Sequence, residues 1–515
     1  MIAAGRLAPG RRLAAAGLLA AALSGCGALR SYRTEMNDTL ALAAGGDATA
    51  AVKRVERSGG LTGTDLLAQL ELGELRRLAG DYPGSFVALS RADASLAADE
   101  QASRTNPSRW AGDLASLVVN DRTRRYEAQD YEKVMVTTRM AMDHLARGDW
   151  DSARVEIKRT HEREALVAQR RAREFAALEE AARERGLTMQ GRELGGYPVQ
   201  VLSTPEALIL RNGYQNALSH YLAGFVYEAL GEPGLAAPGY RKAIELRPAE
   251  PLLDEALAGL DERHARADDG SCDLLLLVET GTIPGRLSLN VDLPVPLLAY
   301  GTFLPLTIAF PVLPPREPRP RPEVRVDGGP ALPAATVLDL DAMARRALLD
   351  DLPGIRLRAV IRATSRALAQ YEMHREIRRR SRKGEDTLGA ALALFAMQVG
   401  GLVLEQADER SWRSLPAAVH LTRVRLPRGA HRLTLAAGGE RAEVEVQLEG
   451  RHALATVRLL GALRVASRAT SPEVAAPTPA SLAAPADSPS AVPPAHQPDP
   501  APTRDEVSAP ASADP

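Results

Sequence analysis

Three short turn motifs at regular spacing constrain the folding of this 515-residue chain more than any other feature. Each motif contains a Gly-Asp pair after a run of helix-forming residues. Gly80 lies 34 residues after Gly46, and Gly148 lies 68 residues, or twice 34, after Gly80. Glycine suits these turns because a tight or left-handed turn needs a residue without a Cβ atom. A period of this length predicts pairs of antiparallel helices stacked as a repeat array.

A fourth motif, at Gly231, follows Gly148 by 83 residues and is out of phase. The segment around it, 217–250, resembles a tetratricopeptide repeat position by position. The resemblance implies small residues where the two helices touch, large aromatic residues, a turn glycine and a terminating proline, namely Gly224, Tyr227, Gly231, Ala236, Tyr240, Ala243 and Pro248. Earlier copies keep fewer of these features, among them Gly80, Gly148 and Ala153. We attribute the phase slip to an insertion that lengthens a helix over 160–185 and adds a loop over 186–205.

The composition pattern divides the chain into six segments. We expect a signal peptide at 1–25, helical repeats at 26–268, a β-rich segment at 269–337, and a helical segment at 338–410. A small antiparallel sheet at 411–466 and a disordered Pro/Ala-rich tail at 467–515 complete the chain. The predicted fold is mainly α: a tetratricopeptide-like helical solenoid, followed by a mixed α/β region with a small antiparallel β-sheet.

Two strand patterns make sharper predictions. The continuous apolar run 272–278 predicts a buried strand, in which Cys272 is a small hydrophobic residue rather than a reactive thiol. Val419 and Leu421 are followed by Val424 and Leu426, a one-residue change of phase that predicts a β-bulge.

The N-terminus has the features of an export signal. Arg6, Arg11 and Arg12 precede an apolar stretch, 13–23, that is too short to span a bilayer. The following Leu23-Ser24-Gly25-Cys26 resembles the lipobox of bacterial lipoproteins, which implies cleavage between Gly25 and Cys26 and a lipid on Cys26. Gly27, in place of an aspartate, implies the periplasmic face of the outer membrane. A simple signal peptide that happens to contain a cysteine is the alternative.

Charge and composition narrow the classes of partner. The net charge is −1, so no global field draws the chain to nucleic acid. Lipid on Cys26 would leave Cys272 as the sole remaining cysteine, without a partner for an intramolecular disulfide. The apolar stretch 388–404 contains Gln398 and many small residues, which favours a packed segment over a membrane span.

A search for chemistry finds little that points to an enzyme. The nine histidines form no HExxH motif and no His/Cys pair at metal spacing, and no GxSxG, Walker or GxGxxG motif occurs. We therefore expect no enzymatic activity, cofactor or metal. Asp339 and Asp341 suit the start of a helix, and 408–412 suits a salt-bridged corner better than a cleft. An envelope enzyme that uses Asp408 or Glu279 stays open as an alternative.

Several short stretches resemble a family of Gram-negative lipoproteins with tetratricopeptide-like helices. They include 131–134, 220–222, 279–281 and 410–416. The family has no established activity, but it gives a lead towards cell-envelope biogenesis. The resemblance implies a scaffold that binds a protein or peptide through polar residues of the first helix of each repeat, with Arg139, Asp143, Asn212, Asn216 and His220 as candidates. A regulator of peptidoglycan synthesis is the second alternative.

The lipobox gives a direct test. In a Gram-negative host, we expect the wild-type chain to incorporate labelled palmitate, and Cys26→Ser to lose the label because the acceptor thiol is gone. Cys272→Ser is the matched control and should keep the label. An unlabelled wild-type chain would favour the simple signal peptide.

Overall fold

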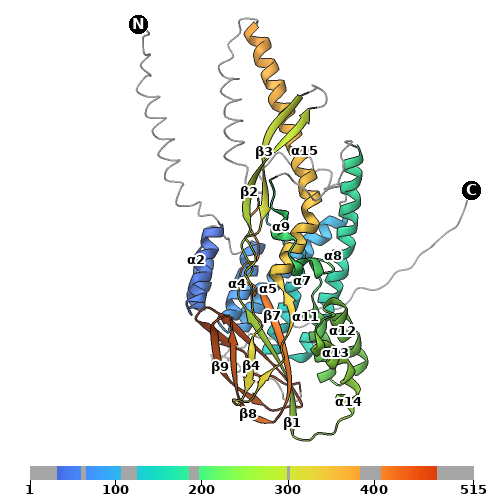
Figure 1. The fold of residues 1–515 in the computed structure, drawn as a ribbon, viewed down its shortest axis with the longest axis vertical. Helices are drawn as coiled ribbons and strands as arrows, with labels where there is room; N and C mark the ends of the chain where they lie inside the picture. The colour runs from blue at the N-terminus through green and yellow to red at the C-terminus, as the bar shows by residue number, and fades with distance from the viewer. Residues whose placement is uncertain are drawn as a thin grey trace, which may run out of the picture. The chain divides into compact units, whose positions relative to one another are not determined.

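Helical hairpins follow one another through the N-terminal half of the chain (Figure 1). The computed structural model describes residues 32–58, 65–105, 125–184, 196–297, 302–382 and 407–472. Within them, the hairpins are α2 (Tyr32–Ala44) with α3 (Ala48–Arg57), α4 (Leu66–Leu78) with α5 (Tyr82–Thr105), α7 (Asp130–Ala146) with α8 (Trp150–Glu184), and α11 (Ala217–Ala229) with α12 (Pro233–Leu246).

The predicted turns lie where the hairpins reverse. The turn glycines Gly46, Gly80, Gly148 and Gly231 have φ angles of 102°, 75°, 80° and 78°, in the left-handed region that disfavours other residues. The aspartate after each of the first three glycines caps the next helix. The side chains of Asp47, Asp81 and Asp149 each accept one hydrogen bond, from the backbone N–H three residues later in the chain. These bonds measure 2.8, 2.9 and 3.1 Å. The prediction of helical hairpins at these motifs is confirmed.

The small and aromatic residues of the fourth hairpin pack as expected. A Cβ atom on Gly224 would lie 2.6 Å from the Tyr240 ring, so the close approach of α11 and α12 requires this glycine. Ala236, Tyr240 and Ala243 are buried, as is Ala153 in the preceding hairpin. Helix α12 ends at Leu246, two residues before Pro248. Tyr227 is only partly buried and lines a pocket described below.

Shorter helices link the hairpins to the rest of the chain. Helices α9 (Val199–Leu202) and α10 (Pro205–Ile209) precede α11, whereas α13 (Pro251–Ala258) and α14 (Leu260–Ala265) follow α12. Helix α15 (Leu340–Arg382) occupies the predicted helical segment and continues through Pro353. Asp339 accepts the N–H of Ala342 at 2.9 Å, which confirms its capping role.

A five-stranded mixed sheet lies next to the hairpins, with strand order β11-β10-β1-β7-β6. Strand β1 (Ser271–Thr280) is central, parallel to β10 (His452–Leu460) and antiparallel to β7 (Ala418–Pro427). Strands β6 (Ala335–Asp339) and β11 (Leu463–Ala466) form the edges. The prediction of a buried strand is confirmed, because Cys272–Val278 lies within β1 and the Cys272 side chain is fully buried.

The predicted separate sheet at 411–466 does not form. Its strands divide between the five-stranded sheet and an antiparallel sheet of order β5-β4-β8-β9, made of β4 (Glu323–Val326), β5 (Ala331–Leu332), β8 (Gly429–Ala437) and β9 (Glu440–Leu448). Strands β2 (Leu287–Leu297) and β3 (Thr302–Val312) form a ribbon that packs on α15 (Figure 1). The physical reason is that β1 is buried on both faces, so its backbone groups must be hydrogen-bonded at both edges, and β7 and β10 of the C-terminal segment supply these bonds.

The fold class is mixed, and the prediction of a mainly α chain is supported only in part. About 54% of the structure is helical and about 21% is strand. The described residues all fall within one compact unit, Met1–Ala476, so the predicted boundaries at 269, 338 and 411 do not separate compact units.

The predicted β-bulge in 419–426 is also wrong. Strand β7 pairs with β1 without interruption, from the pair of Ser271 with Pro427 to the pair of Thr280 with Ala418. Val419 and Leu421 belong to the core shared with the helices, whereas Val424 and Leu426 pack against the second core, between the two larger sheets. The change of phase marks where the buried face switches sides. The irregularity that does occur lies between β6 and β7, at Thr336 and Leu338.

The predicted tail begins too early. Ser467 accepts the N–H of Thr456 at 2.9 Å, and Thr470 forms a bridge with Leu454, so 467–472 belongs to the fold. Residues 473–515, the signal segment with Gly25 and Cys26, and the stretch 388–404 lie outside the described residues. Among the described helices, none is long and apolar enough to cross a membrane.

Candidate functional site

Two of the predicted groove residues, Arg139 and Asp143, are not in a groove. Both are fully buried between the hairpins and the five-stranded sheet. Arg139 pairs with Glu279 of β1 and with Glu74 of α4, the latter at 3.1 Å, and Asp143 pairs with Arg77. The prediction fails at these residues because the sheet covers this face of α4 and α7.

These residues belong to a buried ionic junction, which we define as Glu74, Arg77, Arg139, Asp143, Glu279 and Arg458. It joins α4, α7, β1 and β10, and its three arginines balance its three carboxylates. Burial raises the pKa of Glu279, but the nearby guanidinium groups of Arg139, Arg458 and Arg77 outweigh burial and hold that pKa below its ordinary value. Electrical neutrality makes the burial of six charges tolerable.

The junction bears on the enzyme alternative. The Glu279 side chain is 3% exposed and lies between two arginines, so a substrate cannot reach it. Asp408 forms an ion pair with Arg410 at 2.8 Å, as expected of a salt-bridged corner. Glu279 therefore has a structural position, whereas the Asp408 side chain remains 31% exposed.

A segment of the chain itself occupies the adjoining face of the hairpins. Glu132 of α7 accepts the N–H of Trp412 at 2.7 Å, and Glu71 of α4 accepts the N–H groups of Arg413 and Ser414 at 2.7 and 3.1 Å. Trp412 is fully buried. Burial raises the pKa of both glutamates, while the hydrogen bonds they accept lower it. The first helices of two hairpins thus bind a segment of the same chain that turns at Arg413 and Ser414.

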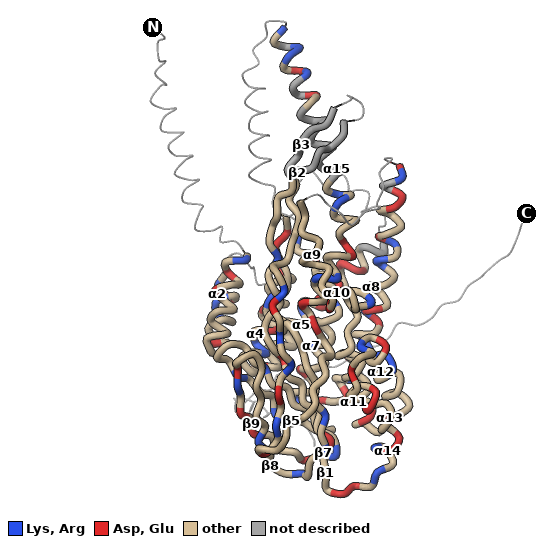
Figure 2. Tube along the Cα trace, viewed as in Figure 1, with Lys and Arg blue, Asp and Glu red and all other residues tan. Residues whose placement is uncertain are grey.

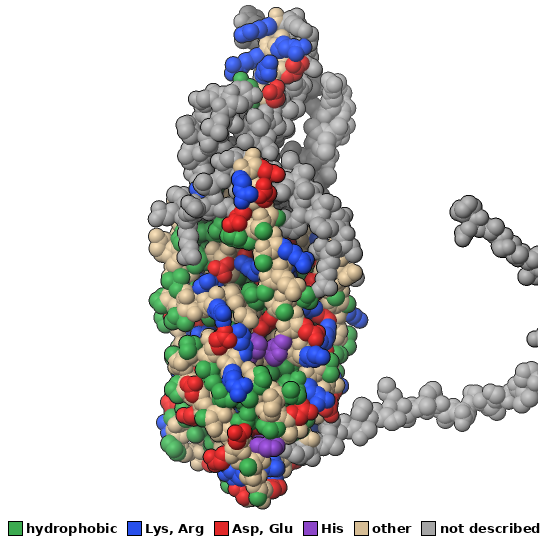
Figure 3. Space-filling view, turned by 90° about the vertical axis from the view of Figure 1, so that its right-hand side faces the viewer, with side chains coloured by type: hydrophobic (Ala, Val, Ile, Leu, Met, Phe, Trp, Pro, Cys, Tyr) green, Lys and Arg blue, Asp and Glu red, His purple; other side chains and the backbone are tan. Residues whose placement is uncertain are grey.

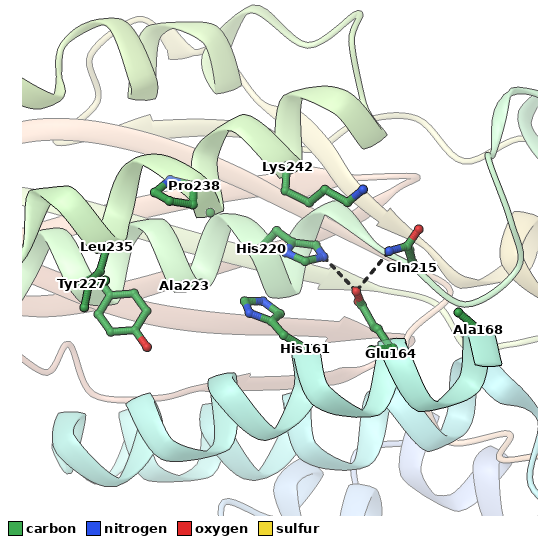
Figure 4. Close-up of a pocket in the computed structure, with 12 residues that line it drawn as sticks. His161, Glu164, Ala168, Gln215, His220, Ala223, Tyr227, Leu235, Pro238 and Lys242 are labelled. Carbon is green, nitrogen blue, oxygen red and sulfur yellow. Dashed lines mark hydrogen bonds and ion pairs between the residues drawn. The ribbon is translucent and has the colours of Figure 1, made fainter. Parts of the chain in front are cut away.

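A pocket opens elsewhere, between α8 and α12, with α11 as its floor (Figure 4). Its volume is about 420 Å³, and we call it the slot. The lining residues are His161, Glu164, Ala165 and Ala168 from α8, Gln215, His220, Ala223 and Tyr227 from α11 and the turn before it, and Leu235, Pro238, Gly239 and Lys242 from α12.

Two histidines and a glutamate form the polar centre of the slot. The His161 and His220 rings stack with centroids 4.4 Å apart and planes at 12°. His220 Nε2 lies 3.0 Å from a carboxylate oxygen of Glu164, to which Gln215 also donates at 3.4 Å (Figure 4). Burial and then the neighbouring His220 lower the pKa of His161 to about 4. His161 is therefore neutral at pH 7.

The remaining predicted groove residues gather at one end of the slot. His220 lines it directly. Asn212 donates to the side-chain oxygen of Gln215 at 2.8 Å, and Asn216 caps α11 by accepting the N–H of Ser219 at 2.9 Å. His161, Glu164 and Lys242 were not among the predicted site residues. The i,i+3 spacing of His161 and Glu164 on one helix face was the available signal.

A cluster of potential metal ligands, Glu228, Asp273 and His452, lies where α11 meets β1 and β10. Two guanidinium groups already neutralise it. Arg263 pairs with Glu228 at 2.6 Å, and Arg423 pairs with Glu228 at 2.8 Å and with Asp273 at 2.5 Å. A metal ion would have to displace both arginines, so the cluster fits guanidinium binding instead.

Positive and negative side chains are mixed on the surface of the described residues. Acidic and basic residues interleave along α8 (Figure 2), and both signs mix across most of the described face in Figure 3. Arginines are concentrated at the end of α15, in 375–382.

Comparisons with known proteins returned no match, whether to protein-family models, to curated proteins or to solved structures.

The ionic junction predicts a large stability loss on neutralisation. Glu279→Gln should lower the free energy of unfolding by about 3–5 kcal/mol, because it leaves buried arginines without their counter-charge. Urea unfolding at pH 7 measures this loss. The matched control is Glu445→Gln on β9, whose side chain is 80% exposed and 3.5 Å from Arg432. It should cost less than about 1 kcal/mol. Equal losses would contradict a stabilising junction.

The buried histidines predict a loss of stability in acid. Burial lowers the pKa of His161 and of His420 to about 4, whereas the unfolded chain has histidine pKa values near 6.5. The unfolded state therefore binds more protons between these values, and stability falls as pH drops from 6.5 towards 4, by at most about 3 kcal/mol for each histidine.

Urea unfolding at pH 7 and pH 4.5 measures this dependence. His420→Gln should reduce the difference between the two pH values, whereas the exposed His264→Gln should leave it unchanged. An unaltered difference in His420→Gln would count against the assignment.

Proposed function

We propose that this chain is a lipid-anchored binding protein of the bacterial periplasm, without enzymatic activity, that holds a segment of a partner protein in the slot. The observation that carries the proposal is the slot itself, an open pocket whose walls come from two different hairpins. Pockets of roughly 300–1,000 Å³ with apolar walls and a few polar groups are typical of ligand sites.

The helical hairpins support a scaffold role. Their left-handed turn glycines and close helix contacts are those expected of a tetratricopeptide-like solenoid, which we propose as the architecture of the N-terminal half. The faces of α4 and α7 are filled in cis by the sheet and by Trp412. Among the described helices, we propose the slot, between the second helices of two hairpins, as the position for a partner segment.

The proposed location rests on the lipobox. A lipid on Cys26 would tether the hairpins at the periplasmic face of the outer membrane. The tether would be short, because residues 27–31 alone separate Cys26 from the start of α2. Tethering raises the effective concentration of the slot for partners at that surface. Proteins of cell-envelope biogenesis are the partners we propose, and the mixed charge in Figure 3 favours a protein over nucleic acid.

Site-specific photo-crosslinking in intact envelopes tests the proposal. A photoreactive phenylalanine analogue at Leu235, which is 55% exposed on the slot wall, should form adducts with a defined set of proteins. The same analogue at Val87, 46% exposed on α5, is the control and should not form them.

A second variant links the adducts to the slot. Ala168→Trp would fill it and should abolish the adducts at Leu235, whereas Ala94→Trp, at an exposed position of α5, should not. Identical adducts at Leu235 and Val87, or adducts that survive Ala168→Trp, would contradict the proposal.

A further inference from the structure

Among the polar groups of the slot, it is the hydrogen-bond donors that have unused capacity. Glu164 is already satisfied, since His220 and Gln215 contact one carboxylate oxygen at 3.0 and 3.4 Å and the Ser219 hydroxyl lies 3.5 Å from the other. Gln215 is satisfied as well, because its own oxygen accepts from Asn212 at 2.8 Å. The carboxylate of Glu164 and the amide oxygen of Gln215 thus already accept hydrogen bonds from the protein.

Two donors, by contrast, have capacity left. Lys242 carries three N–H groups and makes one ion pair, to Glu245 at 3.0 Å, while its side chain remains 28% exposed at the slot. The Nε2 atom of His161 has no hydrogen-bond partner and no contact with solvent. An unpaired buried nitrogen is unfavourable, so a ligand oxygen that reached Nε2 would supply a hydrogen bond that the protein does not.

The local electrostatics favour an anion at this end of the slot. Burial and the neighbouring Arg211 lower the pKa of Lys242, and Glu164 only partly opposes them. A negatively charged ligand would counter the repulsion from Arg211 and favour the charged form of Lys242 by direct attraction. His161 is neutral at pH 7 and can donate a hydrogen bond without adding charge.

The walls of the slot are apolar. Leu235, Pro238 and Ala223 lie along one part of it, at a distance from Lys242 and Gln215 that separates an apolar end from a polar end (Figure 4). A leucine side chain that is 55% exposed beside a pocket favours an apolar ligand group as its neighbour.

We propose that the slot recognises a peptide carboxylate set beside an apolar side chain, with Lys242 and His161 binding the carboxylate and Leu235 and Pro238 contacting the apolar group. The inference rests on the proposed binding function and specifies its ligand. The carboxylate comes from an Asp or Glu side chain or from the C-terminus of the partner segment, and both sources offer the same two oxygens.

Peptide titration against the full chain tests this. The probes are pentapeptides with two central residues varied over Ala, Val, Leu and Phe, each monitored by calorimetry. One set ends in Glu with an amidated C-terminus, one ends in Ala with a free C-terminus, and one ends in Gln with an amidated C-terminus. We expect at least one acidic set to bind at least tenfold more tightly than the neutral set. The tighter acidic set identifies the source of the carboxylate.

Variants locate the binding. Lys242→Met should weaken the acidic peptides at least tenfold and leave the neutral set unchanged, whereas Lys158→Met, an exposed lysine of α8, should have no effect. Ala168→Trp should block every peptide that binds. Circular dichroism confirms that each variant is folded.

The outcomes separate the two proposals. Equal affinity for acidic and neutral peptides, binding unaffected by Lys242→Met, or no binding by any peptide would overturn the carboxylate assignment. Slot-dependent crosslinks from Leu235 would in each case leave the proposed binding function standing. If Leu235 forms no slot-dependent crosslinks and Ala168→Trp does not weaken peptide binding, both the binding function and the carboxylate assignment are overturned.

Discussion

The buried ionic junction is the interaction on which the rest of the fold depends. Its three arginines and three carboxylates come from two hairpins and two central strands, and none of them can be buried alone without a large free-energy cost. The junction therefore fixes the five-stranded sheet against α4 and α7. That placement decides which helix faces remain available to another molecule.

The same placement explains the division between structural and candidate binding surfaces. Glu71 and Glu132 bind the backbone of the segment around Trp412, so the chain supplies its own peptide to the first helices of two hairpins. The slot lies where no strand covers the helices, between α8 and α12. Its histidines, glutamate and lysine form a compact polar centre with apolar walls.

Local features were predictable from the sequence, and long-range pairings were not. The turn glycines and the capping aspartates act within a few residues, so Gly80 and Asp81 reveal their hairpin directly. Arg139 gives no such indication, because its partner Glu279 is 140 residues away and a groove arginine has the same local sequence. The small C-terminal sheet was mispredicted for the same reason: an alternating strand does not specify its neighbour.

The parallel pairing of β1 with β10 has a consequence for the order in which the protein can assemble. β1 reaches its central position only when β10, about 180 residues later, has been synthesised, as the pairing of Leu274 with Ala453 illustrates. The hairpins can form earlier from local contacts. Until β10 supplies Arg458 and a neighbour for β1, the nascent chain exposes an apolar strand edge, the kind of surface that chaperones shield. Completion of the core is thus coupled to the synthesis of its last strands.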